Sequence, residues 1–433
     1  MDKIDRIVVI HDYSIAEGGA GILALKAVEQ YRARGYPVTL LTGQATTDHL
    51  EDLGVTVSGL NSQGLLERSA LQAMRDGIHN SNTVAMIGRW IAEHDTPGTV
   101  YHLNNWAQIL SPTIYKALRP VADRTLVTCH DFFNVCPNGS FLHFGKSEPC
   151  DAKPMSTACF MKQCDRRNAI HKYWRFARHM HLNRIAQFDQ SPSTFSFIHE
   201  EMRLKFRRAG FSAPDTVVIP NPVDAWTNAR IRAEKNAGYL FVGRLGRDKG
   251  ADIALKATSD AGTTITMVGS GELEREASRN FPHARLTGWL QPGEIAQYAR
   301  KARALIVPSR VTEPFGLVIL EAAMSGLPVI VSDSAYLSTD VEHLGFGRRF
   351  SVNDPRRLVE LLEMFSHDDS LIEKMSHKAY EHAPSLCHTA ASWTDAHIDV
   401  FNQKLSRASV PSSRQLEARE NALRGIPSHS QFS

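Results

Sequence analysis

Short apolar runs alternate with longer segments of helical periodicity through the first half of the chain. The apolar runs predict strands at 7–11, 38–41, 99–102 and 125–130, and a further strand that ends at 190–193. Apolar residues recur at helical spacing in 21–34, 107–118 and 195–208. Strands that alternate with helices in this way are typical of a parallel sheet with helices on its faces.

A proline-containing junction at 217–224 separates this series from a second one. Its sequence is Val-Val-Ile-Pro-Asn-Pro-Val-Asp, and two prolines cannot continue the interior of a strand or helix. The second series predicts strands at 239–243, 264–269, 285–287, 304–308 and 328–332. We therefore expect an α/β protein with two doubly wound, Rossmann-like domains facing each other across a cleft, formed by residues 1–220 and 221–385.

Two further segments follow the second domain. Residues 386–405 form an amphipathic helical pattern with Trp393 and Phe401 on its apolar side. Residues 406–433 are polar and end in a run of Ser, His and Gln, which is typical of a disordered tail.

Length, charge and hydropathy limit the number of domains, the kinds of partner and the relation to a membrane that we expect. A chain of 433 residues is long enough for two domains of roughly 200 residues each. With 49 Lys and Arg against 46 Asp and Glu, the net charge of +3 is too small to indicate nucleic acid as the main partner. No segment has the apolar length of a signal peptide or a membrane span. We expect a cytoplasmic protein that contacts the inner face of a membrane at most from its surface.

The most informative motif is the loop and helix at 308–321. Glu313 lies in a Thr-Glu-Pro-Phe-Gly turn after an apolar strand, and Glu321 lies within the helix that follows. Both are expected at the mouth of the sheet, where doubly wound domains bind ligands. The amides of Phe315, Gly316 and Leu317 can hydrogen-bond a phosphate or a sugar hydroxyl, and a carboxylate can accept both protons of vicinal hydroxyls. The alternative is that both glutamates are only exposed charges near a helix start.

A second motif, at 239–250, places two cations beside a helix N-terminus. A buried strand ends at the Gly243 turn, and Arg244 and Lys249 follow before the next helix. Cations are unfavourable beside the positive end of a helix dipole, so a diphosphate held between them would account for their presence. Arg244 can grip phosphate oxygens bidentately, and Lys249 can act as a point charge. A solvated loop is the alternative.

Together these motifs resemble glycosyltransferase family 4. That family has a Gly-Arg…Lys-Gly element after the first strand of its C-terminal domain and a later E-x7-E element, which Arg244, Lys249, Glu313 and Glu321 match in type and order. The Val-Gly-Ser-Gly-Glu-Leu segment around Gly271 also looks like a family loop beside the nucleotide base.

The resemblance implies a fold, an activity and a role for each motif. It implies the GT-B fold and a retaining transfer from a nucleoside-diphosphate sugar to a glycan or lipid-linked acceptor, in polysaccharide or glycoconjugate biosynthesis. Arg244 and Lys249 would hold the donor diphosphate, Glu321 the ribose hydroxyls, and Glu313 the transferred sugar. The chain has no Asp-x-Asp triplet, and no cofactor or divalent metal is expected, because the helix end and the cations would stabilise the leaving group.

Two N-terminal segments are candidates for the other side of the cleft. Gly19 lies in a Glu-Gly-Gly-Ala-Gly segment that is either a backbone-amide ligand site or a plain tight turn. His130 ends a strand in a Cys-His-Asp sequence that resembles the family's His-Asp element beside the donor sugar. At the carboxyl end of a parallel strand, His130 is expected to point into the cleft and to donate a hydrogen bond to a sugar hydroxyl or a departing oxygen.

An insertion at about 132–166 contains four of the six cysteines: Cys136, Cys150, Cys159 and Cys164. Four thiols can ligate a structural zinc ion, but their spacing lacks the close pairs of common zinc sites. Free thiols packed in a loop are the alternative.

A basic segment with aromatic residues follows at 166–184. It either docks on anionic lipid, where a lipid-linked acceptor would reside, or forms a solvated helix with core aromatics. Its cations are Arg166, Arg167, Lys172, Arg175, Arg178 and Arg184.

Two other classes of function stay open from the sequence. A phosphorylase or an epimerase can share the GT-B fold, although phosphorylases of the glycogen type are much longer and need a pyridoxal-bearing lysine. The second is a non-catalytic sugar-nucleotide-binding partner, against which the two cations and two carboxylates count and which measurable donor hydrolysis would exclude.

Overall fold

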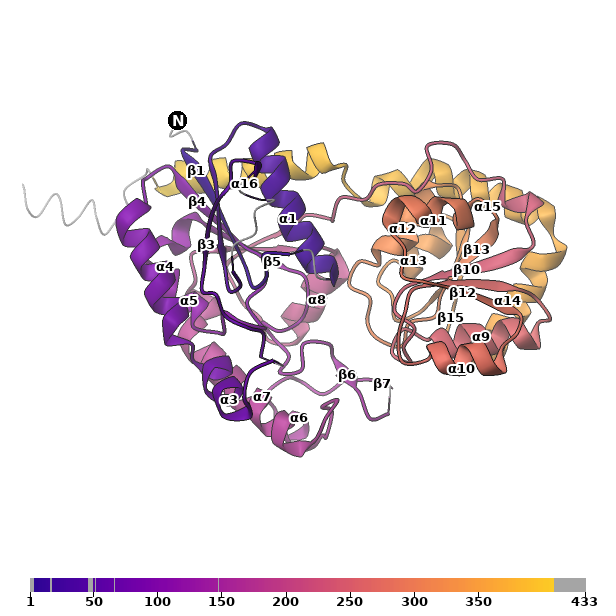
Figure 1. The fold of residues 1–433 in the computed structure, drawn as a ribbon, viewed down its shortest axis with the longest axis horizontal. Helices are drawn as coiled ribbons and strands as arrows, with labels where there is room; N and C mark the ends of the chain where they lie inside the picture. Colours follow the sequence, from indigo (N-terminus) through magenta and orange to yellow (C-terminus); the bar gives the residue numbers. More distant parts are fainter. Residues whose placement is uncertain are drawn as a thin grey trace, which may run out of the picture.

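The computed structural model describes residues 4–15, 18–45, 50, 52–65, 67–146 and 148–408. These residues form two α/β domains joined by extended segments (Figure 1). We call the part built on the seven-stranded sheet the N-terminal domain and the part built on the six-stranded sheet the C-terminal domain. Residues 409–433, most of the segment for which the sequence predicts disorder, lie outside the described residues.

The N-terminal sheet is parallel and has the strand order β3-β2-β1-β4-β5-β8-β9. Its strands are β1 Arg6–His11, β2 Val38–Thr42, β3 Thr56–Gly59, β4 Thr99–Leu103, β5 Thr125–Cys129, β8 Thr194–Phe197 and β9 Asp215–Val218. The central strands β4 and β5 are buried along their whole length, because helices cover both faces of the sheet. The strand order reverses between β1 and β4, and the carboxyl ends of these strands therefore open a crevice.

The helices around this sheet are α1 Gly18–Ala33, α3 Ala70–Ile78, α4 Ser81–His94, α5 Ile114–Ala117, α6 Thr157–Met161, α7 Ala169–Ala186 and α8 Glu200–Arg208. The Cys-containing insertion adds the antiparallel pair β6 Leu142–His143 and β7 Glu148–Pro149, and α6 follows this pair. In Figure 1, α3, α6 and α7 lie together at the tip of the N-terminal domain.

The C-terminal sheet is also parallel, with the order β12-β11-β10-β13-β14-β15. Its strands are β10 Gly238–Val242, β11 Ile265–Val268, β12 Ala284–Gly288, β13 Ala302–Val307, β14 Val329–Ser332 and β15 Gly347–Phe350. Its helices are α9 Ala251–Asp260, α10 Glu274–Asn280, α11 Pro292–Ala299, α12 Leu317–Met324, α13 Ser338–His343, α14 Pro355–His367 and α15 Asp369–His382.

The last described helix, α16 Ala390–Ala408, crosses back to the N-terminal domain (Figure 1). It contacts α1 and β5, and Trp393 and Phe401 are buried in a core cluster with β1 residues such as Ile7. The buried hydroxyl of Tyr31 lies between His102 Nδ1 (3.0 Å) and His397 Nδ1 (2.9 Å), which ties α1, β4 and α16 together. The two ends of the described chain therefore belong to one domain.

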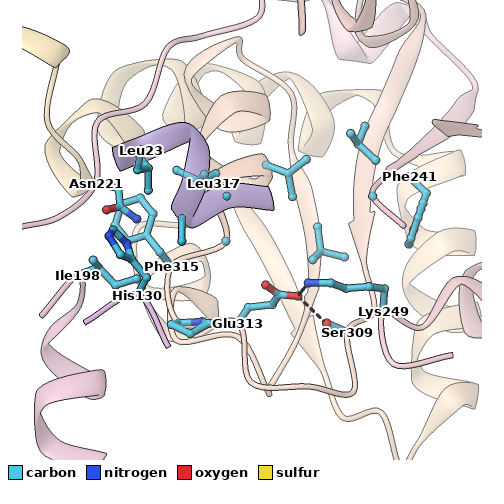
Figure 2. A pocket seen from close by; sticks show the side chains of 18 of the residues that line it. Leu23, His130, Ile198, Asn221, Phe241, Lys249, Ser309, Glu313, Phe315 and Leu317 are labelled. Atoms are coloured by element: carbon cyan, nitrogen blue, oxygen red, sulfur yellow. Dashed lines mark hydrogen bonds and ion pairs between the residues drawn. The ribbon is translucent and has the colours of Figure 1, made fainter. Parts of the chain in front are cut away.

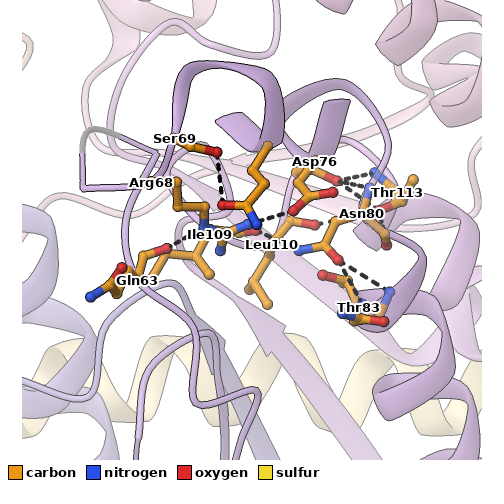
Figure 3. Close-up of polar contacts among 12 residues, drawn as sticks. Gln63, Arg68, Ser69, Asp76, Asn80, Thr83, Ile109, Leu110 and Thr113 are labelled. Carbon is orange, nitrogen blue, oxygen red and sulfur yellow. Dashed lines mark hydrogen bonds and ion pairs between the residues drawn. The ribbon is translucent and has the colours of Figure 1, made fainter. Parts of the chain in front are cut away.

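The helix expected at 107–118 is wrong over most of its length, because only Ile114–Ala117 is α-helical. The amides of 108–110 donate to the buried Asp12 carboxylate at 2.7–2.9 Å instead of to a helix. Asn80, which caps α4, donates to the Ile109 carbonyl, and Thr113 donates to the Asn80 carbonyl (Figure 3). Side-chain partners for the backbone thus compete with helix formation.

The expected strand ending at 190–193 and helix at 195–208 are also wrong in their boundaries. Residues Phe188–Gln190 form a 3₁₀ turn, β8 occupies Thr194–Phe197, and α8 begins only at Glu200. The phenylalanines of β8 continue the helical spacing of α8, which extended the predicted helix into the strand. The edge strands β3 and β15 were missed because they are short and partly polar, as edge strands often are.

Candidate active site

One pocket lies where strands of the two domains end (Figure 2). The N-terminal domain and the junction after it contribute Gly19, Ala20, Leu23, His130, Ile198 and Asn221. The C-terminal domain contributes Phe241, Val242, Gly243, Lys249, Ile306, Val307, Ser309 and the loop from Glu313 to Val318. Of the residues predicted from the sequence, the pocket brings together Gly19, His130, Lys249, Glu313, Phe315, Gly316 and Leu317.

Lys249 and Glu313 form an ion pair on the C-terminal side of this pocket (Figure 2). Ser309 Oγ donates to the same carboxylate oxygen, Oε1, at 2.8 Å. The Lys249 side chain keeps 35% of its exposure, so its ammonium can still reach a ligand. The pair therefore offers a cation and an oriented carboxylate at adjacent positions.

Gly250 explains how Lys249 reaches Glu313. It caps α9 with a φ of +71°, and a Cβ built there would lie 1.8 Å from the Pro308 carbonyl oxygen. Only glycine lets the loop after β10 approach the loop after β13 this closely. The contact places Lys249 beside the 309–313 segment.

The N-terminus of α12 also opens on the pocket. Gly316, with a φ of +67°, precedes the helix, and Phe315, Gly316 and Leu317 all line the pocket. Unpaired amides at a helix start carry partial positive charge and bind anions. The Lys249 ammonium and this helix end therefore place two sources of positive potential around one space.

Glu321 lies one turn further along α12, outside the residues that line the pocket. Burial raises the pKa of Glu321 to about 7, with a hydrogen bond from the Trp226 side chain opposing the shift. The nearby Asp224 raises this pKa further and is itself ion-paired with Lys26 of α1 at 2.6 Å. The carboxyl thus lies next to a contact between the two domains.

Besides Glu321, two other predicted ligand residues lie outside the pocket. Arg244 is ion-paired with Asp248, and its side chain keeps 43% of its exposure. Gly271 lines a separate hollow with Glu272 and Arg275. Both stay near the cleft edge of the C-terminal sheet, because the Leu245 amide donates to the Ser270 carbonyl at 3.0 Å.

His130 lies opposite, on the N-terminal side (Figure 2). Its Nε2 donates to Asn104 Oδ1 at 2.9 Å, and its Nδ1 has no partner among the described residues. Burial lowers the pKa of His130 to about 4, so the ring is neutral near pH 7. A neutral ring that donates through Nε2 presents Nδ1 as an acceptor, which differs from the donor role expected from the sequence.

Three further residues of this site were not identified in the sequence. Asn104, at the end of β4, orients His130. His11, at the end of β1, is buried with both ring nitrogens unpartnered within the described ranges, and burial lowers its pKa to about 3. Asn221 lines the pocket with a buried, unpartnered Oδ1, again among the described residues. A polar residue directly after an apolar run was the available signal for His11 and Asn104, and the Pro-Asn-Pro junction was the signal for Asn221.

Gly19 is helical and does not form a plain tight turn, since α1 begins at Gly18. Its neighbours at 16–17 lie outside the described residues. Gly19, Ala20 and Leu23 present the start of α1 to the pocket.

The four insertion cysteines are all buried and unbridged. No group of three or more His, Cys, Asp or Glu residues in the described ranges is arranged to hold a metal ion. The buried Lys172 ammonium instead lies 3.4 Å from Cys164 Sγ and 3.7 Å from Cys159 Sγ. The geometry therefore gives no support to the zinc alternative.

The basic segment at 166–184 includes most of α7, and its cations are divided between surface and interior. Lys172 and Arg178 are buried, and Arg175 is ion-paired with Asp165 at 2.8 Å. Several apolar side chains of this helix and of its neighbours α3 and α6 are instead exposed: Leu71, Met74, Phe160, Met161, Ile170, Tyr173 and Met180. None of the helices in the described part of the chain is apolar over a length that could cross a membrane.

Comparison with known sequences gives matches for the C-terminal part. Residues 224–382 match the family described as glycosyl transferases group 1. A glycogen synthase from Mycobacterium tuberculosis is 35% identical over 133 residues, which are 28% of this chain and 32% of that protein. The chain thus aligns with about a third of this relative.

Comparison with solved structures extends over nearly the whole chain. Sucrose-phosphate synthase from Thermosynechococcus elongatus superposes with a TM-score of 0.69 at 19% identity, covering 93% of this chain and 99% of that one. The Anabaena protein HepE, in complex with UDP and glucose, superposes with a TM-score of 0.63 at 17% identity, covering 92% and 99%. The predicted fold class is confirmed: the chain has the GT-B fold, and its residues 224–382 match the glycosyl transferases group 1 family.

Proposed function

We propose that this chain is a retaining glycosyltransferase of family 4. It transfers a hexose from a nucleoside-diphosphate sugar to a glycan or lipid-linked acceptor in polysaccharide or glycoconjugate biosynthesis. The observation that carries the proposal is the Lys249–Glu313 pair beside the α12 N-terminus, with His130 in the same pocket.

The donor would lie along the C-terminal wall of the pocket. Lys249 and the amides that begin α12 would hold the diphosphate, and Glu321 would accept the ribose hydroxyls. The UDP and glucose bound to HepE support a nucleotide-sugar ligand for this fold. Arg244 would bind the diphosphate only after breaking its ion pair with Asp248. We therefore assign Arg244 a smaller contribution to diphosphate binding than Lys249.

The chemistry would depend on charge and position. As the bond to the diphosphate breaks, negative charge grows on the leaving oxygens, and Lys249 and the helix end stabilise it without a divalent metal. Glu313, held by Ser309, would face the positive charge that develops on the sugar. His130 Nδ1 would accept a hydrogen bond from a sugar hydroxyl. The acceptor would attack on the face of the leaving group, with no protein nucleophile.

Nucleotide binding tests the donor site. UDP, ADP and GDP are titrated into the full chain and unfolding temperatures are compared, because a ligand of the native state stabilises it by mass action. Each diphosphate is compared with the monophosphate of the same base, and one diphosphate should raise the unfolding temperature clearly more than its monophosphate. Lys249→Met should abolish this difference, whereas Arg244→Met, the matched cation outside the pocket, should keep most of it. Equal loss in both variants would contradict the assignment.

The stereochemistry is tested separately with the sugar nucleotide of the base that binds. Proton NMR of the released or transferred sugar should show the anomeric configuration of the donor. An inverted product would exclude the retaining reaction.

The proposal includes peripheral contact with a membrane through the tip formed by α3, α6 and α7. Leu71, Met161 and Ile170 are 82%, 76% and 69% exposed there, and Arg166 and Arg167 lie at the start of the same region. Apolar side chains beside cations favour the interface of an anionic bilayer.

A further inference from the structure

The insertion after His130 holds a cluster of sulfur atoms around one cation. Lys172, in the first turns of α7, is 1% exposed. Its ammonium donates to Cys164 Sγ at 3.4 Å and to Cys159 Sγ at 3.7 Å. Among the described residues it has no other hydrogen-bond acceptor and no carboxylate at ion-pair distance. The cluster plays no part in the proposed sugar transfer.

This arrangement is unusual for a buried lysine. An unpaired charge is costly in the protein interior, and it is normally balanced by a carboxylate. Here the groups that can balance the ammonium are thiols, and a nearby ammonium stabilises a thiolate. The thiolate is the reactive form of cysteine toward oxidants, especially beside a second thiol that can resolve the first product.

We propose that Cys159 and Cys164 form a peroxide-sensitive dithiol, with Lys172 as the group that activates it. Cys164, the closer of the two sulfurs, attacks one oxygen of hydrogen peroxide. An S–O bond forms, the O–O bond breaks, and water leaves with the proton that the thiol has lost. Cys159 then attacks the Cys164 sulfur, an S–S bond forms, and the S–O bond breaks with loss of a second water. The dithiol is oxidised by two electrons and the peroxide is reduced to two waters.

The site lies where it can affect the cleft. Cys164 is followed by Asp165, which pairs with Arg175, and by Arg166, which reaches Glu272 of the C-terminal domain at 4.0 Å. The segment between the two cysteines thus leads directly into a contact between domains. A disulfide would fix this segment and change how Arg166 meets its partner.

Tryptic mapping tests the assignment directly. Lys162 lies between Cys159 and Cys164, so trypsin separates the two cysteines unless a disulfide joins them. After treatment of the full chain with hydrogen peroxide, a non-reducing digest should contain peptides 147–162 and 163–166 joined, lighter by two hydrogens than their sum. Because Lys153 precedes a proline, the first peptide contains both Cys150 and Cys159, so fragmentation of the joined species should place the bond at Cys159. Dithiothreitol should release them. Absence of this species, or a bond from Cys164 to Cys136 or Cys150, would overturn the proposal.

Variants separate the roles of the three groups. Cys159→Ser should leave a sulfenic acid at Cys164 that dimedone captures, whereas Cys136→Ser and Cys150→Ser should still form the disulfide. Lys172→Met should slow oxidation by about tenfold or more, because the attacking sulfur loses the ammonium that lies against it, and Lys172→Arg should restore most of the rate. An unchanged rate in Lys172→Met, folded by its circular dichroism spectrum, would remove Lys172 from the mechanism. If Lys172→Met does not fold, oxidation of wild-type Cys164 no faster than that of Cys387, a half-buried thiol outside the insertion, would do the same.

Discussion

The buried carboxyl of Glu321 changes charge in the pH range of an ordinary assay. Burial raises the pKa of Glu321 to about 7. Above that pH the carboxylate can accept two ribose hydroxyls, and below it the protonated form loses acceptor capacity. We expect the Kd of the bound nucleoside diphosphate to rise by up to about tenfold for each pH unit below 7. Isothermal titration across this range measures it.

Glu321→Gln is the control for this effect. It should bind the nucleotide weakly even above pH 7, and its Kd should vary much less with pH. A pH dependence identical to that of the parent chain would assign the titration to another group.

Glu313 should matter to turnover more than to nucleotide binding. Glu313→Gln keeps the shape and an acceptor for Ser309 but removes the charge that would face the sugar. We expect kcat to fall at least about tenfold with a Kd for nucleotide within about threefold of the parent value. Ser309→Ala, which leaves the carboxylate in place, should have a smaller effect on kcat. Equal turnover in Glu313→Gln would remove this residue from the reacting centre.

Side-chain direction limited what the sequence could tell about individual residues. Lys249 and Glu313 meet in the pocket because the glycine turns at Gly250 and Gly316 fix both loops. Arg244 turns instead to Asp248, four residues away. His11 and Asn104 could be assigned to the site only once the sheet order was known, with β4 beside β5, the strand before His130, and β1 beside β4.

At the level of elements, a single substitution at Gly250, where two loops touch, should lower the stability of the protein. Gly250→Ala combines a φ of +71° with a Cβ 1.8 Å from a carbonyl oxygen, whereas Gly262, with a φ of +63°, has open space around it. We expect Gly262→Ala to cost about 1 kcal/mol of stability, and Gly250→Ala to cost clearly more, about 3 kcal/mol. Urea unfolding measures both. Equal losses would mean that the loop relaxes easily.

The predicted elements succeeded where burial dictates the pattern and failed where polar contacts do. The buried strands near the centre of each sheet were found within a residue or two of their ends. The segment at 107–113 has helical spacing, but its amides bind Asp12, a residue distant in sequence. The spacing of apolar residues within a segment cannot show that its amides bind a side chain so far away in the sequence.

At the scale of the molecule, α16 is held against the N-terminal domain by contacts of Tyr31 with two neutral histidines, His102 and His397. Burial lowers the pKa of His397 to about 3, whereas the unfolded chain binds this proton near pH 6.5. The contribution of His397 to the free energy of unfolding is therefore intact above pH 6.5. It falls by about 1.4 kcal/mol for each pH unit as the pH is lowered toward 3. His397→Asn should lose stability at pH 7 and show a pH slope smaller by one proton in urea unfolding.

Tyr31→Phe is the matched control. It removes the hydroxyl that joins His102 to His397 but keeps both rings, so it should lower stability without changing the slope. A slope unchanged in His397→Asn would contradict the assignment.

Contact with a membrane is tested by sedimentation with vesicles that contain phosphatidylglycerol. Leu71→Glu and Met161→Glu should each reduce the bound fraction severalfold, because a carboxylate at the tip opposes both apolar insertion and the anionic surface. Trp289, also exposed but in the C-terminal domain, provides the control, and Trp289→Glu should bind like the parent chain. Equal effects at the two places would exclude the tip as the contact surface.

The return of α16 to the N-terminal domain makes the order of biosynthesis unusual. During synthesis, the first sheet emerges from the ribosome long before the helix that covers β1 and β5 with Trp393 and Phe401. The apolar face over β1 and β5 therefore stays uncovered while the whole six-stranded domain is translated and folds. The C-terminal domain is thus inserted in sequence between two parts of the N-terminal domain, and it can complete its own core before the N-terminal domain can.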